Sequence, residues 1–287
     1  MLSAWLASVL RVREDAVRML DSETWPASRS HRRNWSCAIA ALLSLPGCNG
    51  APLDVIGPLP RHLDDALVAH WTFDEDSGDV AFDVSGNEHD GQLTGGGRLT
   101  DGRFGGALRF SGQDSVAVSN FPAATPDWSV SAWIRVSPSQ LEDNRGIGTV
   151  MTTENFYTDG WELNVDLTTR QSEFVFSYWS PTLDGYLHTE CPCVATDTWV
   201  HLAAVVDGAT NHVTLYVNGA AMDQQSKLSD VLPGDSTLHF GRWNMEGRFL
   251  TADLDDVAVW GRSLTAGEIA ELNNESPRSR LTATLRR

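Results

Sequence analysis

Short strand-like segments follow one another through most of this 287-residue chain. Each is an apolar or alternating run rich in β-branched and aromatic side chains, and turn-forming residues separate it from the next. The runs lie at residues 67–73, 107–110, 115–118, 128–136, 148–152, 160–167, 173–179, 199–207, 212–217, 237–243 and 254–260. The clearest hairpin turn is Asn218-Gly219, because both residues accept a positive φ angle. This spacing of strands and turns predicts an all-β sandwich of two antiparallel sheets.

The hydrophobic period changes immediately after the last of these runs. Residues 254–260 have the pattern of a strand, whereas Thr265 and Glu268 have the spacing of a capping box that opens a helix. Ile269 and Leu272 would be the apolar contacts of that helix. The sequence therefore predicts a short C-terminal helix that follows the closing strand.

Charge and composition limit the class of partner. The chain has a net charge of −17, and 41% of its residues are apolar, which is enough for a sizeable core. Binding to a phosphate backbone needs clustered lysine and arginine, so this balance argues against a nucleic-acid partner. Calcium, cationic partners and neutral sugars stay open.

The amino-terminal part has the pattern of an export signal. A basic segment at residues 29–33 precedes a short apolar run at residues 34–44, which is too short to span a bilayer. The following Leu45-Pro-Gly-Cys48 resembles a bacterial lipobox, which implies a lipid on Cys48 and attachment to the cell envelope, at the outer membrane or the cell surface. A plain secretory peptide, giving a secreted protein, is the alternative.

These features divide the chain into four regions. Residues 1–47 are predicted to be the export segment, residues 48–64 a tether, residues 65–275 the folded domain, and residues 276–287 a basic, disordered tail. The mature domain then keeps only two cysteines, Cys191 and Cys193. In an oxidising compartment they can close a tight disulfide; free thiols or half of a metal site are the alternatives.

The order of motifs along the folded region resembles a known family. The segments LVAHWTFDEDSG, DVSGNEHDG, GALRFSG, WSVSAWIRV, TWVHLAAVVDGATNHVTLYVNG, LHFGRW and LDDVAVWGRSLTAGEI follow one another as they do in laminin-G-like domains of the concanavalin-A-like lectin/glucanase superfamily. The resemblance implies a jelly-roll sandwich that binds sugars or other ligands.

A turn rich in oxygen ligands lies near the start of this region. Asp83, Asn87 and Asp90 could present carboxylate and amide oxygens to calcium, which takes six to eight such ligands. In related jelly rolls this turn lies near the acidic part of the last strand, which implies that Asp255 or Asp256 could complete a structural calcium site. The alternative is that Asp83 and Asn87 stabilise turns by bonding to nearby backbone groups.

Alternation along residues 161–166 sends Glu162, Asn164 and Asp166 to one face of a strand. This arrangement is similar to that of laminarinase-type glycosidases, whose catalytic acids alternate along one strand. However, the middle position is Asn164, and the outer acids are about 13 Å apart along a strand of this geometry. A polar face that lines a binding groove, or that faces solvent, is therefore preferred over a catalytic one.

Aromatic side chains supply the other candidate binding residues. Flat rings can stack on sugars or pack in a core, and large aromatics dominate sandwich interiors. The candidate ligand-binding set is Trp161, Glu162, Tyr186, His188 and Trp243. By contrast, His201 lies inside an apolar strand and is predicted to be a core histidine rather than a ligand.

The preferred function is a noncatalytic, lectin-like or adhesion domain that binds a glycan or an envelope protein. The alternative is a glycoside hydrolase or polysaccharide lyase on the same scaffold, since the fold hosts both kinds of protein. No nucleophile elbow, phosphate loop or HExxH motif is present in the sequence.

Overall fold

The computed structural model describes residues 63–275 apart from residues 123–124, 143–145, 155–159, 169–171, 181–184, 227–234 and 244–246. The described residues all fall within one compact unit, Pro58–Arg287. The predicted export segment, Cys48, nearly all of the predicted tether and the basic tail lie outside the described residues. In the described part, no helix has the length and apolar character needed to cross a membrane.

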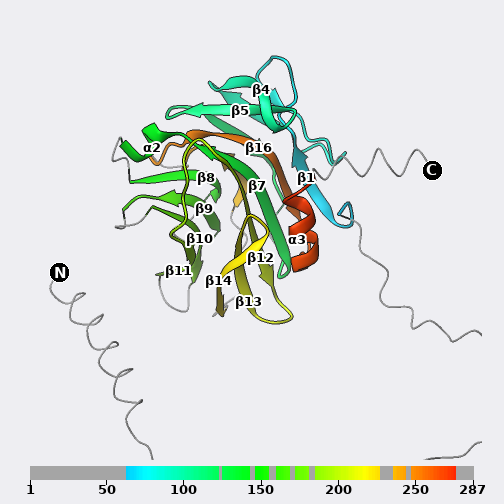
Figure 1. The fold of residues 1–287 in the computed structure, drawn as a ribbon. Helices are drawn as coiled ribbons and strands as arrows, with labels where there is room; N and C mark the ends of the chain where they lie inside the picture. The colour runs from blue at the N-terminus through cyan, green and yellow to red at the C-terminus, as the bar shows by residue number, and fades with distance from the viewer. Residues whose placement is uncertain are drawn as a thin grey trace, which may run out of the picture. The chain divides into compact units, whose positions relative to one another are not determined.

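Two antiparallel sheets pack face to face (Figure 1). Sheet A has the order β14-β13-β12-β7-β16-β5-β4, and β1 also pairs with β16. Its strands are β1 (Leu67–Trp71), β4 (Gly97–Phe104), β5 (Gly106–Ser111), β7 (Trp128–Val136), β12 (Trp199–Asp207), β13 (His212–Val217), β14 (Ala220–Ser226) and β16 (Thr251–Trp260).

Sheet B has the order β11-β10-β9-β8-β15-β6-β3-β2. Its strands are β2 (Val80–Ala81), β3 (Gly91–Thr94), β6 (Ser115–Ser119), β8 (Ile147–Glu154), β9 (Trp161–Asp166), β10 (Glu173–Ser180), β11 (Gly185–Cys191) and β15 (Asp235–Phe240). The predicted all-β, two-sheet architecture is confirmed. The sequence patterns missed β2, β3, β4, β11 and β14, which are short, glycine-containing or polar.

Alternation along the strands builds the main core between the sheets. On β7, Ala132 and Ile134 face inward, and on β9, Leu163 and Val165 do the same. These side chains are essentially excluded from solvent. Each strand therefore turns its other set of side chains outward, and for β9 that set includes Glu162 and Asn164.

A second apolar cluster covers part of the outer face of sheet A. Helix α3 (Ala266–Leu272) packs Ile269 and Leu272 against Ala203 and Trp260 of the sheet. The predicted capping box is present, because the Thr265 side chain accepts from Glu268 N while the Glu268 carboxylate accepts from Thr265 N. The short helix after the closing strand is thus confirmed.

A tight turn and a second short helix complete the described secondary structure. Asn218 and Gly219 have φ angles of 50° and 80° and connect β13 to β14, which confirms the predicted hairpin. Helix α2 (Pro138–Glu142) follows β7.

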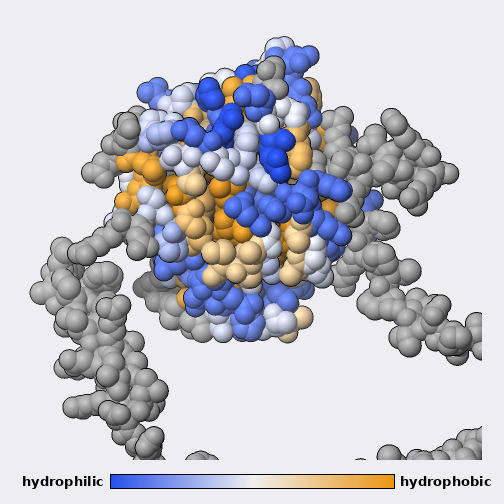
Figure 2. Space-filling model, viewed as in Figure 1, coloured by the Kyte–Doolittle hydropathy of each residue, from blue (hydrophilic) through white to orange (hydrophobic). Residues whose placement is uncertain are grey.

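On the face seen in Figure 2, hydrophilic residues gather toward β4 and β5 and around α3, with apolar residues between them.

Candidate functional site

Glu162 is the centre of a polar cluster on the outer face of sheet B. Its side chain is 0% exposed although it points away from the core between the sheets. Arg248 places Nη1 3.1 Å from one carboxylate oxygen, and Thr149 donates its hydroxyl proton to the other at 2.9 Å. Burial raises the pKa of Glu162, while Arg248, Thr149 and Asn164 act in the opposite direction.

Arg248 covers this buried carboxylate and is itself held from several sides. Its guanidinium carbon lies 4.4 Å from the centroid of the Trp243 ring, a cation–π contact. Its backbone carbonyl accepts from Thr149 N at 2.9 Å. The side chain is 28% exposed, so it is the part of the Glu162–Arg248 pair that meets solvent.

Strand register extends the cluster into a lateral row. His188, Ser177, Glu162, Thr152 and His239 lie opposite one another on β11, β10, β9, β8 and β15. Neighbouring strands are about 4.8 Å apart, so His188 and Glu162 are separated by roughly 10 Å across the sheet. All of these side chains except His188 are buried.

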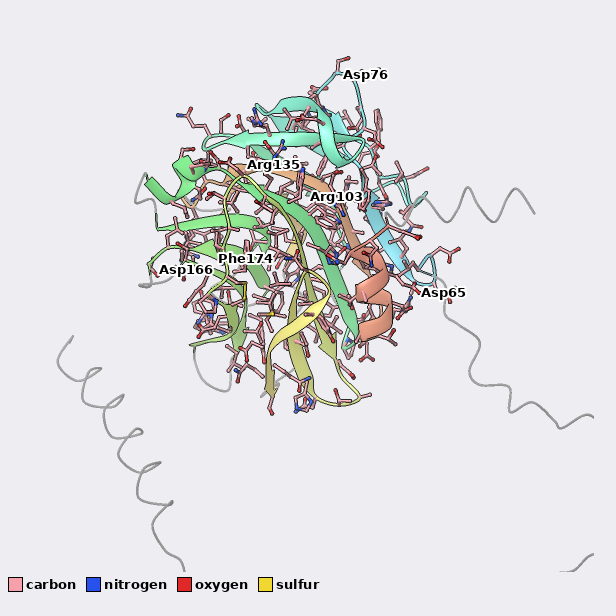
Figure 3. The ribbon with its side chains drawn as sticks, in the orientation of Figure 1. Asp65, Asp76, Arg103, Arg135, Asp166 and Phe174 are labelled. Atoms are coloured by element: carbon pink, nitrogen blue, oxygen red, sulfur yellow. A yellow bond between two sulfur atoms is a disulfide. The ribbon has the colours of Figure 1, made fainter. Side chains whose placement is uncertain are left out.

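Three rings gather at the β10–β11 end of the row. Trp179 and Tyr186 lie opposite each other on the two strands, with ring centroids 4.9 Å apart in an edge-to-face arrangement. The His188 ring follows, 6.2 Å from Tyr186. Trp179 and Tyr186 are half-buried and His188 is exposed. In Figure 3, Asp166 and Phe174 mark the adjoining strands β9 and β10.

Three of the predicted ligand-binding residues are buried. Trp161 is only 2% exposed and packs in the core against Trp128, with ring centroids 4.7 Å apart. It therefore faces the opposite way from Glu162. Glu162 itself is enclosed, and Trp243, expected at an exposed rim, is 7% exposed beneath Arg248.

Tyr186 and His188 do lie at the surface of this face. The ligand-binding set predicted from the sequence leaves out Trp179 and Arg248. Trp179 shares its parity with Ser177, so alternation could have placed it on the outer face. Arg248 lies in an irregular segment and had no periodic signal.

The two acidic side chains of β9, Glu162 and Asp166, lie in different surroundings. Retaining glycosidases need two carboxyl groups about 5–5.5 Å apart, both able to reach substrate. Glu162 is enclosed and paired with Arg248, whereas Asp166 lies at the end of β9 and accepts from the backbone N–H and the hydroxyl of Thr168. Glu162 therefore holds the Arg248 guanidinium in place over the outer face of sheet B.

The predicted calcium ligands have other partners. Asp83 accepts from His70 N and Ser85 N through one oxygen, and from the Ser85 hydroxyl and His89 N through the other. Burial opposes ionisation, but these hydrogen bonds outweigh it and lower the pKa of Asp83. This is the turn-stabilising role that was the alternative to calcium.

Asn87 and Asp90 have similar roles in the same turn. Asn87 donates to Leu67 O and Val68 O, and Asp90 accepts from Asp83 N at 2.8 Å. Within the described ranges, no three His, Cys, Asp or Glu residues form a group able to hold a metal ion. Calcium binding by these residues therefore stays a prediction.

The two acids of the last strand, β16, belong to sheet A, and His70 of the neighbouring strand β1 contacts both Asp83 and Asp256. Asp256 has a φ angle of 51° at an irregularity of β16, and its Oδ1 lies 2.7 Å from His70 Nε2. Asp255 accepts from Phe104 N at 2.8 Å through Oδ2. Burial, with a smaller effect from neighbouring Asp256, raises the pKa of Asp255 to about 7.

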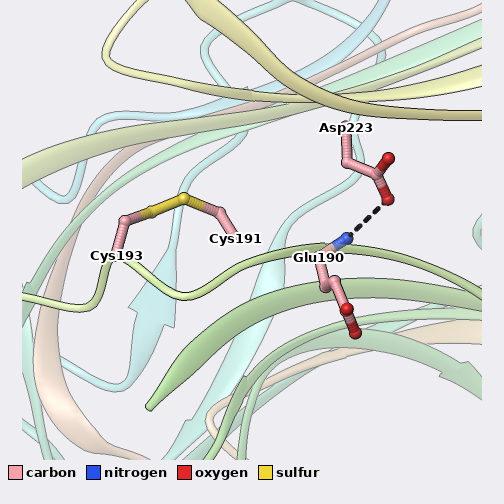
Figure 4. The surroundings of a disulfide bond; sticks show 4 residues. All are labelled: Glu190, Cys191, Cys193 and Asp223. Carbon is pink, nitrogen blue, oxygen red and sulfur yellow. Dashed lines mark hydrogen bonds between the residues drawn. A yellow bond between two sulfur atoms is a disulfide. The ribbon is translucent and has the colours of Figure 1, made fainter. Parts of the chain in front are cut away.

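The two cysteines of the domain form a disulfide at the end of β11 (Figure 4). Cys191 is buried in the core, and Cys193 lies just beyond the strand. Beside them, Glu190 N donates to Asp223 of β14 at 3.2 Å. The disulfide thus lies where the edge strands of sheets A and B come together.

Comparisons with solved structures show the same fold. Domain 4 of the arabinanase AbnA from Geobacillus stearothermophilus, in complex with arabinotriose, has a TM-score of 0.58 and 21% identity, covering 72% of this chain and 98% of that domain. The ligand-binding domain of botulinum neurotoxin serotype D, in complex with N-acetylneuraminic acid, has a TM-score of 0.57 and 17% identity, covering 73% of this chain and 51% of that one.

A second structure, of the botulinum neurotoxin serotype D binding domain, gives similar values, with a TM-score of 0.56 and 17% identity over 73% of this chain and 52% of that one. This chain thus spans about half the length of the toxin domains. No curated protein sequence matches it. A family model described as the concanavalin A-like lectin/glucanases superfamily matches residues 110–270, more than half of the chain. The chain therefore belongs to the concanavalin A-like lectin/glucanases superfamily.

Proposed function

We propose that this protein is a noncatalytic carbohydrate-binding domain and that it binds glycans on the outer face of sheet B. The observation that carries the proposal is the set of rings Trp179, Tyr186 and His188, in register with the row that leads to Glu162 and Arg248. Rings combined with a few fixed polar groups are typical of small-molecule sites. The two comparison domains, with bound arabinotriose and N-acetylneuraminic acid, support the same class of ligand.

Charge favours a neutral glycan at this face. Glu162 neutralises Arg248, and Asp166 and Glu190 lie on the flanking positions of β9 and β11. A carboxylated or sulfated sugar would meet like charge there, while a neutral sugar could accept from the exposed part of Arg248. The pairing with Glu162 fixes the guanidinium before a ligand arrives, which lowers the entropy lost on binding.

Affinity electrophoresis against a panel of neutral and acidic polysaccharides tests the proposal. Trp179→Ala and Tyr186→Ala should each weaken retention on the best neutral polysaccharide about tenfold, equivalent to roughly 1.4 kcal/mol. Phe82→Ala is the matched control, since Phe82 is an aromatic residue that is 52% exposed next to β2, at the other edge of sheet B. Equal losses in all three variants, or none, would contradict the proposed face.

The same panel addresses catalysis. The wild-type protein should retain polysaccharide without releasing reducing ends or unsaturated products over many hours. Product release that disappears in Glu162→Gln would instead support the hydrolase or lyase alternative. Thermal melts of each variant separate loss of binding from loss of folding.

We also propose display at the bacterial cell envelope through a lipid on Cys48, by the lipobox pattern at residues 45–48. Cys48→Ser should move the protein from the membrane fraction to the soluble fraction of cells. Ser44→Ala is the matched control, because it changes a neighbouring residue outside the lipobox. Continued membrane association of Cys48→Ser would overturn lipid attachment at this residue.

A further inference from the structure

A polar pocket of about 500 Å³ lies on the outer face of sheet A, across β5, β16 and β7. Its volume is within the range of about 300–1,000 Å³ that is usual for small-molecule sites. Five of its lining residues are charged: Asp101, Arg109, Arg135, Asp197 and Asp253. This pocket therefore differs in chemistry from the ring-bearing outer face of sheet B.

Strand pairing explains how the charged side chains meet. Arg109 of β5 and Arg135 of β7 both lie opposite Asp253 of β16, which is the strand between them. Ile134 and Leu254, which are adjacent to two of these residues in sequence, belong to the core between the sheets. The charged side chains therefore point outward. Arg135 is labelled in Figure 3.

Asp253 is shared by the two arginines, and its side chain is only 7% exposed. Arg109 donates from Nε and Nη2 to the two carboxylate oxygens, at 2.7 and 3.1 Å, and Arg135 donates from Nε at 2.9 Å. The guanidinium carbon of Arg135 also lies 4.8 Å from the centroid of the Trp199 ring. Both guanidiniums are thus fixed before a ligand arrives, which lowers the entropy lost on binding.

One carboxylate does not use all the donors of two guanidiniums. A guanidinium has five N–H donors. Nη1 of Arg109 and Nη1 of Arg135 have no hydrogen bond to the residues that the structure describes. The Arg109 side chain is 53% exposed and that of Arg135 is 22% exposed. Arg109 therefore offers the more accessible donors to a molecule in the pocket.

Two further carboxylates supply acceptors. The Asp101 side chain of β4 is 75% exposed, and its Oδ2 lies 3.9 Å from Arg135 Nη2, too far for a hydrogen bond. Asp197, just before β12, is also exposed. With three carboxylates and two guanidiniums, the lining has a net charge of −1. An anion would meet this excess negative charge, whereas a neutral hydroxyl can accept from Arg109 and donate to Asp101.

We propose that this pocket is a second sugar site, which binds neighbouring hydroxyl groups of a neutral sugar. One hydroxyl oxygen accepts from Arg109, and hydroxyl protons are donated to Asp101 or Asp197. The class of ligand rests on the proposed function, but the site lies on the other sheet and uses ion-paired side chains in place of rings. Because the two sites lie on opposite outer faces of the sandwich, one molecule can hold two glycan chains.

Titration calorimetry on a variant without the sheet B rings tests the second site. The variant combines Trp179→Ala with Tyr186→Ala. The neutral probes are arabinotriose, xylotriose, cellotriose and maltotriose, and trigalacturonate is the acidic probe. At least one neutral trisaccharide should still bind this double variant saturably, with one site per chain. Trigalacturonate should bind at least tenfold more weakly, because of the excess negative charge.

Substitutions at the pocket, made in the same double variant, test the contacts. Asp101→Asn should weaken binding about five- to tenfold, since it removes an exposed carboxylate acceptor and leaves the pairing of Asp253 intact. Arg109→Gln should weaken binding at least as much. Glu271→Gln is the matched control, because it removes one carboxylate from the exposed side of α3 on the same sheet and should change binding less than about twofold. Thermal melts show whether each variant is folded.

The possible outcomes separate the two sites. Trisaccharide binding to wild type that is absent from the double variant would overturn the sheet A site and leave the sheet B site in place. Equal binding to both proteins that Asp101→Asn weakens would support the sheet A site and contradict the sheet B site. Absence of neutral trisaccharide binding to the double variant, binding that neither pocket substitution changes, or equally tight binding of trigalacturonate would each overturn the sheet A site.

Discussion

Each of the two sheets has one buried carboxylate on its outer face, and these two carboxylates differ in their partners. Glu162 on sheet B is enclosed with Arg248, and both of its oxygens have partners. Asp255 on sheet A is equally enclosed, but its Oδ1 has no partner within the described residues, and its neighbour Asp256 has the same charge. Burial on an outward face is thus compatible with either an ion pair or a protonated acid.

The surroundings explain the difference. On sheet B, a positively charged side chain reaches over the strand from an irregular segment and stacks on Trp243. On sheet A, the nearby Arg103 guanidinium lies instead over the Trp133 ring, 4.4 Å from its centroid. Figure 3 marks Arg103 and Arg135 over this sheet. A buried carboxyl group without a nearby positive charge is more stable in its neutral, protonated form.

The largest expected effect is at the ion pair. Glu162→Ala should lower the free energy of unfolding by about 3–5 kcal/mol, because Arg248 would keep a largely buried charge without its partner. Asp166→Ala on the same strand is the control and should cost less than about 1 kcal/mol. Urea unfolding measures the loss of stability in both variants. Similar losses would show that the Glu162–Arg248 ion pair contributes no more to stability than Asp166 does.

The pH dependence of stability should reveal Asp255. Its pKa is about 7 in the folded protein against an ordinary value of 3.8, so the folded state holds a proton that the unfolded state releases. The contribution is fully present below pH 3.8 and is lost as pH rises through 7. Asp255→Asn should therefore remove a decline of about 2–3 kcal/mol between pH 5 and 8. Parallel pH profiles of wild type and variant would refute this.

Asp83 links the turn at residues 83–90 to sheet A. His70 of β1 donates its backbone N–H to Asp83 and places its ring nitrogen Nε2 beside Asp256. Asp83→Ala should cost about 1–2 kcal/mol through lost hydrogen bonds, equally with and without a chelator. Ser85→Ala, which removes one of those bonds, should cost less. A melting temperature that a chelator lowers in wild type but not in Asp83→Ala would instead establish the predicted calcium site.

The smallest effect concerns His201, which lies opposite Trp133 on sheet A. Burial lowers the pKa of His201 to about 4, so its neutral form is favoured in the folded state. Stability should fall as pH drops below 6.5, opposite in direction to the Asp255 effect. His201→Leu should remove about 1 kcal/mol of that fall between pH 7 and 5.5, as measured by urea unfolding at the two pH values. An unchanged pH profile in His201→Leu would show that His201 does not contribute.

Local sequence patterns predicted much of the architecture. Alternation assigned Leu163 and Glu162 to opposite faces of β9, and the capping box and Asn218-Gly219 marked the closing helix and a hairpin. Polar or glycine-containing strands such as β4 and β14 gave no comparable signal, because their place in the sheet depends on pairing with neighbours and not on their own hydrophobic period. His201 was predicted to be a core histidine; it is buried, but it lies opposite Trp133 on the outer face of sheet A, and its Nδ1 has no partner among the described residues.

The sequence by itself determined the fold class and which side chains leave the core, because both follow from short-range periodicity. Only the tertiary structure decided what those outward side chains meet. Glu162 meets Arg248, 86 residues away, and becomes a buried support, while Trp161 joins the core and packs against Trp128. Such contacts depend on how irregular segments cross the sheets, and no local pattern contains that information.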